Sequence, residues 1–297
     1  MDPLISIIVP TYNRAPLLAE ALASVRAQTF GDWECLVIDD GSTDHTPAFL
    51  GTLDEPRLRL LRAEHSGNPA RVRNLGIAVA RGRYLAFLDD DDLWEPMKLA
   101  SQVRLLQEGG CRWSYTGYVR LDAGGNRIWQ STPEWIRGGS ILEPLLDVKV
   151  AVAMPTVMAE RALVEEVGRF DEAARTREDY SLWLDLAARA EVGVIQEHLA
   201  VVRDHPGRVF RPWGYRFSVI LYRKWLGRLT DPRLRRLCRR RIVDTYLGEA
   251  RRLIDAGQWG PALPAIVQAL PWDPRHAVRR LARGLKRLAT SANIRSR

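Results

Sequence analysis

The chain has 297 residues, 46% of them hydrophobic and 27% charged, which is the composition of an ordinary soluble globular protein with one or two domains. Every apolar run is shorter than the roughly 20 residues of a membrane-crossing helix. The acidic opening MDPLISIIVP does not fit a signal peptide. We therefore expect neither a membrane-crossing helix nor a signal peptide. The three cysteines form no CxxC pair, which favours reduced thiols in the cytoplasm over a disulfide-bonded secreted domain.

The net charge of +8 is divided unevenly along the chain. Residues 211–297 contain 21 Lys and Arg against 5 Asp and Glu, whereas residues 1–210 contain 23 against 31. The longer part is therefore acidic and the shorter part strongly basic. We expect a domain followed by a basic extension.

The first hundred residues alternate between strand and helix patterns. Helical spacing of apolar residues covers 15–28 and 68–82, a turn and a helix follow the segment DDGSTD, and another helix is expected after Pro96. Such alternation predicts a parallel, doubly wound α/β sheet. Its strands are expected in short apolar runs at 4–9, 33–39, 57–62 and 83–88.

The pattern is less regular after residue 111. A helix is predicted at about 178–190. We expect this part to continue the same sheet and to add an acceptor-side half. Strand-like segments occur at 113–121, 155–159 and 198–203.

Beyond residue 211 the strand patterns stop. Basic helices are predicted over 231–257 and 273–289, and the segment 258–272 separates them. Basic amphipathic helices suit an anionic membrane surface, so peripheral membrane contact is one expectation. The other is an appendage that packs with a solvated basic face. No nucleic-acid-binding motif is present, and we expect no nucleic acid partner.

Three polar segments fall at the predicted carboxyl ends of strands, where open α/β sheets bind their ligands: PTYNR (10–14), DDGSTD (39–44) and DDDD (89–92). The fingerprints GxGxxG and GxxxxGK[ST] are both absent, which argues against a nicotinamide dehydrogenase and a P-loop phosphotransferase. A sugar nucleotidyltransferase would carry a glycine-rich basic loop where this chain has PTYNRAP.

The run Asp89–Asp92 concentrates negative charge directly after a predicted strand. In an extended segment Asp89 and Asp91 share one face. Hard cations such as Mg²⁺ and Mn²⁺ bind one or two carboxylates and take their other ligands from water and phosphate. The alternative is a solvated acidic loop, with Asp92 starting the next helix.

Asp179 stands at the head of an apolar helical stripe formed by Leu182, Trp183 and Leu186, so its carboxylate is expected at a core or a cleft. Burial would raise its pKa, and the helix N-terminus would lower it. Alternatively, Thr176 and Asp179 could form a capping box.

Four segments resemble the family 2 glycosyltransferases, inverting enzymes with the GT-A fold: SIIVPTYNR, LVIDDGSTD, NPARVRNLGIAVARGRYLAFLDDDD and VGRFDE…REDYSLWL. The resemblance covers about residues 4–205. It implies a GT-A type, Rossmann-like doubly wound mixed sheet over 1–210, with a C-terminal α-helical extension over 211–297. Residues 1–110 would bind the nucleotide-sugar and residues 111–210 the acceptor.

The resemblance also implies an activity. A glycosyltransferase of the hexosyltransferase type would move a sugar from a nucleotide-diphosphate sugar, UDP favoured, to an acceptor hydroxyl on a sugar or lipid-linked glycan. Its place would be in cell-envelope polysaccharide or glycoconjugate synthesis, in the cytoplasm and on the inner face of the membrane. The alternative is a nucleotide-sugar-binding or membrane-docking module without turnover.

Donor-binding roles follow from the same resemblance. Tyr12 would lie under the base beside Pro10 and Thr11, Asp40 would accept a hydrogen bond from the base imide, and Arg73 would contact the diphosphate or the base. Each role has a structural alternative. Tyr12 could be a core aromatic, and Asp40 could form an Asx turn, a role open to Asp39 as well. Arg73 could lie on a solvated helix face, with Arg71 as a weaker substitute.

Asp89 and Asp91 would bind a divalent cation, Mn²⁺ or Mg²⁺, and Asp90 would lie near the donor ribose or sugar. His205 would be a third metal ligand, although a lone histidine is more often structural. Asp179 would be the general base, with Glu178 as the alternate. Trp94 and Trp135 are either sugar-stacking aromatics or core residues.

Overall fold

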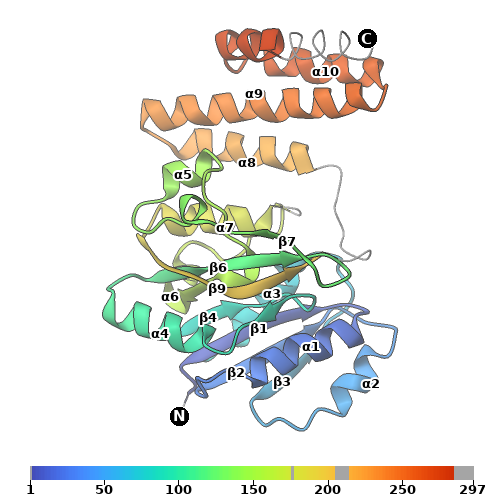
Figure 1. The fold of residues 1–297 in the computed structure, drawn as a ribbon, viewed down its shortest axis with the longest axis vertical. Coiled ribbons are helices and arrows are strands. Elements are labelled where there is room, and N and C mark those ends of the chain that lie inside the picture. The colour runs from blue at the N-terminus through green and yellow to red at the C-terminus, as the bar shows by residue number, and fades with distance from the viewer. Residues whose placement is uncertain (1, 175–176, 205–213, 284–297) are drawn as a thin grey trace. The chain divides into compact units, whose positions relative to one another are not determined.

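The computed structural model describes residues 2–174, 177–204 and 214–283 (Figure 1). The chain divides into two compact units, Met1–Phe210 and Arg211–Arg297. Each unit has hydrophobic clusters of its own. Within the described residues, no helix is both long enough and apolar enough to cross a bilayer.

A mixed β-sheet forms the centre of the first unit (Figure 1). Its described strands are β1 (Ile5–Thr11), β2 (Trp33–Asp39), β3 (Leu58–Arg62), β4 (Tyr84–Phe87), β5 (Leu93–Trp94), β6 (Trp113–Leu121), β7 (Arg127–Gln130), β8 (Met158–Glu160) and β9 (Val192–Arg203). They follow the order β3-β2-β1-β4-β8-β6-β9-β5, and β7 pairs with β6. The pairs among β1, β2, β3 and β4 are parallel, whereas β8 is antiparallel to β4 and to β6. The predicted mixed sheet, continued by the residues after 111, is confirmed.

Helices lie on both faces of this sheet. The first unit contains α1 (Ala15–Arg26), α2 (Thr46–Gly51), α3 (Pro69–Val79), α4 (Lys98–Glu108), α5 (Leu142–Leu146), α6 (Arg161–Glu166) and α7 (Glu178–Ala187). The helices predicted over 15–28, 68–82 and 178–190 are confirmed. The short elements β5, β7, α5 and α6 were missed, because two to six residues carry too little periodicity to be recognised.

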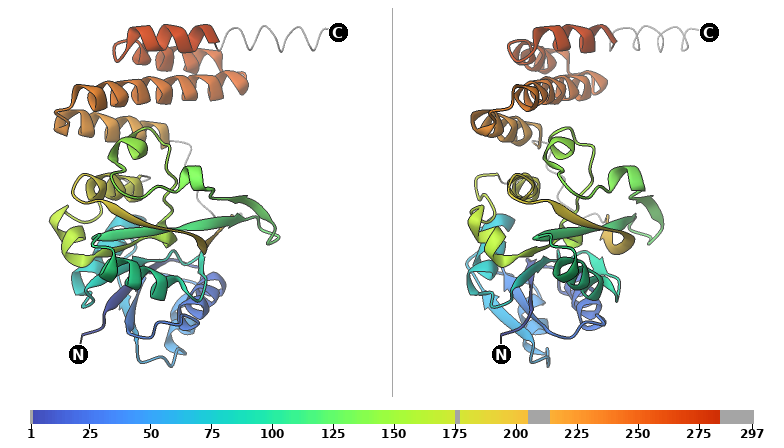
Figure 2. Two further views of the ribbon diagram at one scale, coloured as in Figure 1. Left: turned by 60° about the vertical axis from the view of Figure 1, so that its left-hand side comes forward. Right: turned by 90° about the vertical axis from the view of Figure 1, so that its left-hand side faces the viewer.

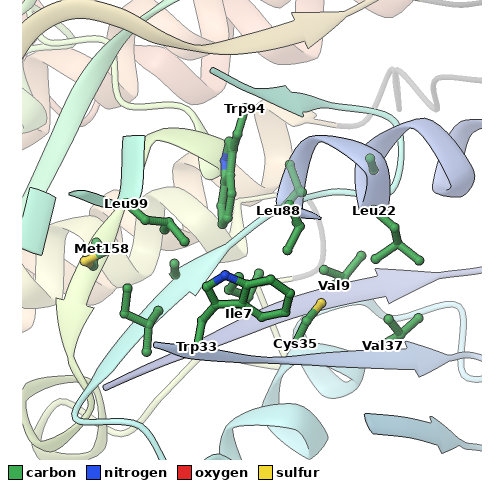
Figure 3. Packing of buried hydrophobic residues seen from close by; sticks show 14 of the residues in the cluster. Ile7, Val9, Leu22, Trp33, Cys35, Val37, Leu88, Trp94, Leu99 and Met158 are labelled. Atoms are coloured by element: carbon green, nitrogen blue, oxygen red, sulfur yellow. The ribbon is translucent and has the colours of Figure 1, made fainter. Parts of the chain in front are cut away.

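Alternate residues of the central strands feed two cores, one on each face of the sheet. Ile7 and Val9 of β1 pack with Leu22 of α1, and Figure 3 shows this core beside Trp94. Ile8 points the other way, toward Gly76 of α3, where an added Cβ would lie 3.1 Å from the Ile8 side chain. Because both faces are covered, β1 reads as a continuous apolar run.

An aromatic cluster builds the core on the α3 face. Phe87 at the end of β4 meets Phe170 edge to face, with ring centroids 5.3 Å apart. Trp183 of α7 stacks on Trp113 of β6 at 6.4 Å. These rings fix the position of α7, and therefore of the acidic residues at its start, against the sheet.

Strand β9 is longer than the predicted strand at 198–203. It runs parallel to β6 with register shifts on either side of Gly117. A Cβ at Gly117 would lie 2.7 Å from the carbonyl oxygen of Gln196, so only glycine lets the irregular backbone of β9 come this close.

The second unit consists of helices in its described part: α8 (Gly214–Arg228), α9 (Pro232–Asp255), α10 (Trp259–Ala269) and a helical segment over 274–283 (Figure 2). The basic helix predicted over 231–257 is confirmed as α9. The prediction that 258–272 only separates two helices is wrong, because most of it forms α10. This helix contains Pro261 in its first turn, where backbone N–H groups have no intrahelical partner, and Pro264 in its interior, where one backbone hydrogen bond is lost. A row of small residues packs inward: Ala262, Ala265 and Ala269.

Candidate active site

The three polar segments predicted at strand ends meet at one edge of the sheet. Thr11 and Asp39 are partners at the last position of the parallel strands β1 and β2. Asp40 follows and donates its backbone N–H to the carbonyl oxygen of Thr11 over 2.9 Å. From the third segment, Asp90 accepts a hydrogen bond from Thr11 Oγ1 at 2.7 Å. Thr11 therefore joins all three segments.

Tyr12 leaves the end of β1 and is 38% exposed, so it is not a core aromatic, whereas Pro10 is partly buried within the strand. His65 stacks on the Tyr12 ring, with centroids 4.0 Å apart and planes at 22°. At this separation no third ring fits between them. A nucleotide base could therefore use the other face of Tyr12, or replace His65. The sequence does not reveal the role of His65, because an isolated histidine in a loop forms no motif.

Asp39 and Asp40 have different tasks. Asp39 Oδ1 accepts the backbone N–H of Ser42 at 2.8 Å, so Asp39 takes the turn role that the sequence left open. Asp40 accepts from Ser66 N and Ser66 Oγ at 2.9 Å each, and from Gly67 N at 3.0 Å. Asp40 Oδ2 also lies 3.1 Å from His65 Nδ1. About four acceptor positions of this carboxylate are thus approached by protein donors, and a further donor would have to replace His65.

Arg73 of α3 is buried, so it does not lie on a solvated helix face, whereas Arg71 is exposed. Its Nη2 lies 2.5 Å from Asp89 Oδ1, and its Nη1 lies 3.2 Å from Glu178 Oε1. Burial alone would lower the pKa of Arg73, but Asp89 and Glu178 outweigh it and the pKa is raised. One guanidinium therefore connects the aspartate run to the start of α7.

Asp89, Asp91 and Asp92 each place a carboxylate oxygen within 4.8 Å of the other two. The predicted pair, Asp89 and Asp91, is thus brought together. Asp92 does not start a helix, since α4 begins at Lys98, and its Oδ1 accepts the backbone N–H of Arg203 at 3.1 Å. A set of carboxylate oxygens alone fits a hard divalent cation.

The buried carboxylate of Asp90 is paired with a residue that sequence analysis missed. Arg14 Nη1 lies 3.0 Å from Asp90 Oδ1 and 2.8 Å from Asp91 Oδ2. Burial raises the pKa of Asp90 to about 6, although Arg14 acts to lower it, and the charge of Asp91 adds to the rise. Arg14 is the last residue of PTYNR, and only the fold shows that it reaches the aspartates.

Replacing Arg14 with Gln should destabilise the metal-free protein by about 2 kcal/mol, because two buried carboxylates then lack their shared cation. Urea unfolding in EDTA measures this difference. Mn²⁺ should restore more stability to the variant than it adds to the wild type. The exposed arginine of α3 supplies the control, Arg71→Gln, which should leave the unfolding midpoint unchanged. Equal stability of Arg14→Gln and wild type would contradict this role.

The chain at the end of β9 also contacts the aspartate run. Arg203, at the end of β9, donates from Nε to the carbonyl oxygen of Asp91 at 2.5 Å, and also pairs with Glu20. Arg203 thus fixes the backbone of the run, a contact that the sequence does not reveal. His205, the predicted third metal ligand, lies outside the described residues.

The acidic pair Glu178 and Asp179 opens α7, with Arg177 at the N-cap position and no side-chain cap. Asp179 Oδ1 accepts the backbone N–H of Tyr180 at 2.6 Å. Thr176, its predicted partner in a capping box, lies outside the described residues. The apolar stripe behind the pair is buried as predicted, through Leu182, Trp183 and Leu186.

Burial raises the pKa of both carboxyl groups. For Glu178 the neighbouring charge of Asp179 adds to this effect, and Arg73 opposes it. For Asp179 the hydrogen bond from Tyr180 and the charges of Arg177 and Arg73 oppose it without cancelling it. A carboxylate whose pKa is raised is a better proton acceptor near neutral pH. Because Glu178 is bound to Arg73, Asp179 has the freer carboxylate of the two.

The two tryptophans considered for sugar stacking behave differently. Trp94 is buried, and its Nε1 donates to the carbonyl oxygen of Pro155 at 2.7 Å, so it is a core residue. Trp135, in the 3₁₀ turn Pro133–Trp135, is 40% exposed and stays a candidate.

Residues 6–168 match the family model described as glycosyl transferase family 2. An uncharacterized glycosyltransferase of Rickettsia felis is 36% identical over 207 residues, which are 69% of this chain but only 34% of that protein. The chain thus spans about a third of that relative. The Escherichia coli protein WfgD, named as a UDP-Glc:α-D-GlcNAc-diphosphoundecaprenol β-1,3-glucosyltransferase, is 30% identical over 65% of this chain and 74% of its own length.

Solved structures share the fold. Staphylococcus aureus TarS 1–349, in a complex with UDP-GlcNAc, superimposes with a TM-score of 0.68 at 20% identity, covering 91% of this chain and 82% of TarS. The mannosyltransferase PcManGT from Pyrobaculum calidifontis, with GDP-Man and Mn²⁺, gives 0.60 at 21% identity, covering 96% of this chain and 80% of the other. Because the family model also spans more than half of the sequence, the chain belongs to glycosyl transferase family 2.

Proposed function

We propose that the chain is a metal-dependent inverting glycosyltransferase that moves a sugar from a nucleotide-diphosphate sugar to an acceptor hydroxyl. The observation that carries this proposal is the bridge made by Arg73. It places a carboxylate cluster suited to a cation beside a second acidic pair whose pKa values are raised. Donor activation and proton removal would then occur on two sides of one buried arginine.

The donor nucleotide would lie along the carboxyl edge of the sheet, in the half formed by residues 1–110. Its base would contact Tyr12 and Asp40, beside Pro10 and Thr11, and would take the place that His65 holds against both residues. UDP is favoured, and two similar proteins support this choice. WfgD is named as a UDP-Glc enzyme, and TarS was solved with UDP-GlcNAc.

A divalent cation, Mn²⁺ or Mg²⁺, would be held by Asp89 and Asp91, with Asp92 and His205 as further candidates. PcManGT, solved with Mn²⁺, supports a metal in this fold. When bound, the metal supplies positive charge that neutralises the diphosphate of the donor. Asp90, held by Thr11 and close to the cluster, would contact the ribose or sugar.

The chain's own residues would carry the proton and orient the groups. Asp179 accepts the proton of the acceptor hydroxyl, and the oxygen of that hydroxyl forms a bond to the anomeric carbon. The bond from that carbon to the diphosphate oxygen breaks, and the nucleoside diphosphate leaves with the electron pair. Attack from the opposite face inverts the anomeric configuration. Arg73 holds Asp89 and Glu178 in place during this exchange.

The acceptor would be a sugar or a lipid-linked glycan of the cell envelope, bound by the half formed by residues 111–210. The name of WfgD, whose acceptor is a diphosphoundecaprenol-linked sugar, supports this class. Such a substrate would bring the enzyme to the cytoplasmic face of a membrane. The basic extension over 211–297 would then provide peripheral contact.

Calorimetric titration with UDP, TDP and GDP, in Mn²⁺ and in EDTA, tests the proposal. One nucleotide should bind at least about tenfold more tightly with Mn²⁺, because a cation held by Asp89 and Asp91 would neutralise the charge of the diphosphate. The matching nucleotide-sugars are then screened for release of the nucleoside diphosphate. If no nucleotide binds in Mn²⁺, the glycosyltransferase proposal is wrong for this chain.

A further inference from the structure

Helix α10 presents an apolar surface outward as well as inward. Trp259, Leu263 and Val267 are 62%, 62% and 63% exposed, and Leu270 continues the row. Their spacing of four, four and three residues keeps them on one face of the helix. The opposite face is already used, because its alanines are buried in the unit's own clusters with residues of α9. We call these four exposed residues the apolar stripe.

Exposed cations follow the apolar stripe in the sequence. Residues 258–271 contain no charged side chain, whereas the adjacent helical segment over 274–283 exposes Arg275 and Arg279 beside Val278. Within the part of the chain that the structure describes, no carboxylate lies within ion-pair distance of Arg275 or Arg279. The nearby Arg280 is held by Asp244 at 2.8 Å. Apolar and cationic groups are therefore both presented to solvent.

Only some partners can cover the apolar stripe and also pair with the exposed arginines. A second copy of the chain would cover the apolar stripe, but it would bring together two units in which residues 211–297 carry 21 basic against 5 acidic residues. Like charges of that size repel. A nucleic acid offers phosphates and no apolar layer. An anionic lipid bilayer offers phosphates for the arginines and an acyl boundary for Trp259 and its neighbours.

We propose that the apolar stripe, with Arg275 and Arg279, docks the protein on the surface of an anionic lipid bilayer. The helix lies in the interface, with Trp259, Leu263 and Val267 in the acyl boundary and the arginines among the headgroups. This surface deepens the proposed function, since it rests on the peripheral contact inferred there for a lipid-linked acceptor.

Vesicle flotation of the full chain tests this surface without donor or acceptor. Wild type should float with vesicles that contain phosphatidylglycerol, and much less with phosphatidylcholine alone. The variant Leu263→Ser/Val267→Ser should lose at least about tenfold in partition, because its apolar contact with the acyl boundary is removed. Both sites are exposed, so folding should survive, and circular dichroism checks it.

The matched control replaces two similarly exposed apolar residues of the other unit, as Leu60→Ser/Ile128→Ser, and should float as wild type does. Arg275→Glu/Arg279→Glu should lose the preference for anionic vesicles by about tenfold or more.

Three outcomes overturn the docking surface: wild type does not float, the stripe variant floats as wild type does, or wild type is a dimer that the stripe variant dissociates. Each leaves the nucleotide titration untouched, so the two proposals fail separately.

Discussion

Replacing Asp179 with Asn is expected to lower kcat by about a thousandfold while the affinity for the nucleotide diphosphate in Mn²⁺ stays near that of wild type. Asparagine has the same shape but cannot accept the proton of the acceptor hydroxyl. Its side-chain oxygen can still accept the backbone N–H of Tyr180, so the start of α7 is preserved. Steady-state kinetics and calorimetry, done on one preparation, measure the two quantities.

The pH dependence of kcat provides a second test of this base. Burial raises the pKa of Asp179, and a base acts only in its ionised form. Activity should therefore fall as the pH drops through the raised pKa, at a pH above the ordinary aspartate pKa of about 3.9. The same shift means that the folded protein binds this proton more tightly than the unfolded chain. Stability is thus lost as the pH rises through the raised pKa, and Asp179→Asn should not lower Tm at neutral pH.

Glu178→Gln is the matched control for the neighbouring carboxylate. Glu178 lies 3.2 Å from Arg73, and the amide oxygen of the substituted glutamine could still accept a hydrogen bond from that arginine. Because the pKa of Glu178 is raised as well, Glu178→Gln should not lower Tm at neutral pH, and it should lose less than a tenth of the activity that Asp179→Asn loses. If Glu178→Gln were the inactive variant and Asp179→Asn retained turnover, the base would be Glu178. If the wild type bound donor and never turned over, the chain would be a binding module.

Much of the sheet is predictable because its signals are local. Strands β1 and β2 are buried on both faces, so each forms an apolar run that ends in polar residues. Parallel pairing then brings Thr11 beside Asp39 with no further information. The antiparallel β8 between β4 and β6 could not be predicted in the same way. Its three residues, Met158–Glu160, acquire their place from partners far away in the sequence.

The missed parts of the candidate site are long-range contacts. Arg14 reaches Asp90 across 76 positions, and Arg203 reaches the carbonyl oxygen of Asp91 across 112. An arginine after a strand looks the same in sequence whether it faces water or a buried carboxylate. By contrast, Asp89 and Asp91 are two positions apart and are brought together by a local turn, not by the extended backbone expected from the sequence. The backbone N–H of Asp92 donates to the carbonyl oxygen of Asp89 over 3.1 Å and closes this turn.

The segment 258–272 shows the opposite failure, in which a local signal misleads. The helical patterns on either side predicted that this segment only separates two helices, yet Ala262, Ala265 and Ala269 allow the backbone of α10 to pack inside the second unit. Packing of small residues outweighs the low helix propensity of proline and glycine there.

Asp91→Asn should weaken Mn²⁺-dependent binding of the nucleotide diphosphate by at least about a hundredfold. An amide oxygen keeps the shape of the side chain and its hydrogen bond from Arg14, but the change removes one of the two charges proposed to hold the cation. Binding measured in EDTA should change much less. Calorimetry with and without Mn²⁺ separates the two effects.

Two comparison variants interpret the result for Asp91. Asp122→Asn removes an equal charge from an exposed turn and should bind as wild type does, which controls for net charge. Asp92→Asn tests the third carboxylate of the cluster. A loss as large as that of Asp91→Asn would make Asp92 a metal ligand, whereas no loss would confine its task to holding the backbone of Arg203. If Asp91→Asn itself bound nucleotide and Mn²⁺ as wild type does, the aspartate run would be a structural acidic loop neutralised by Arg14 and Arg73.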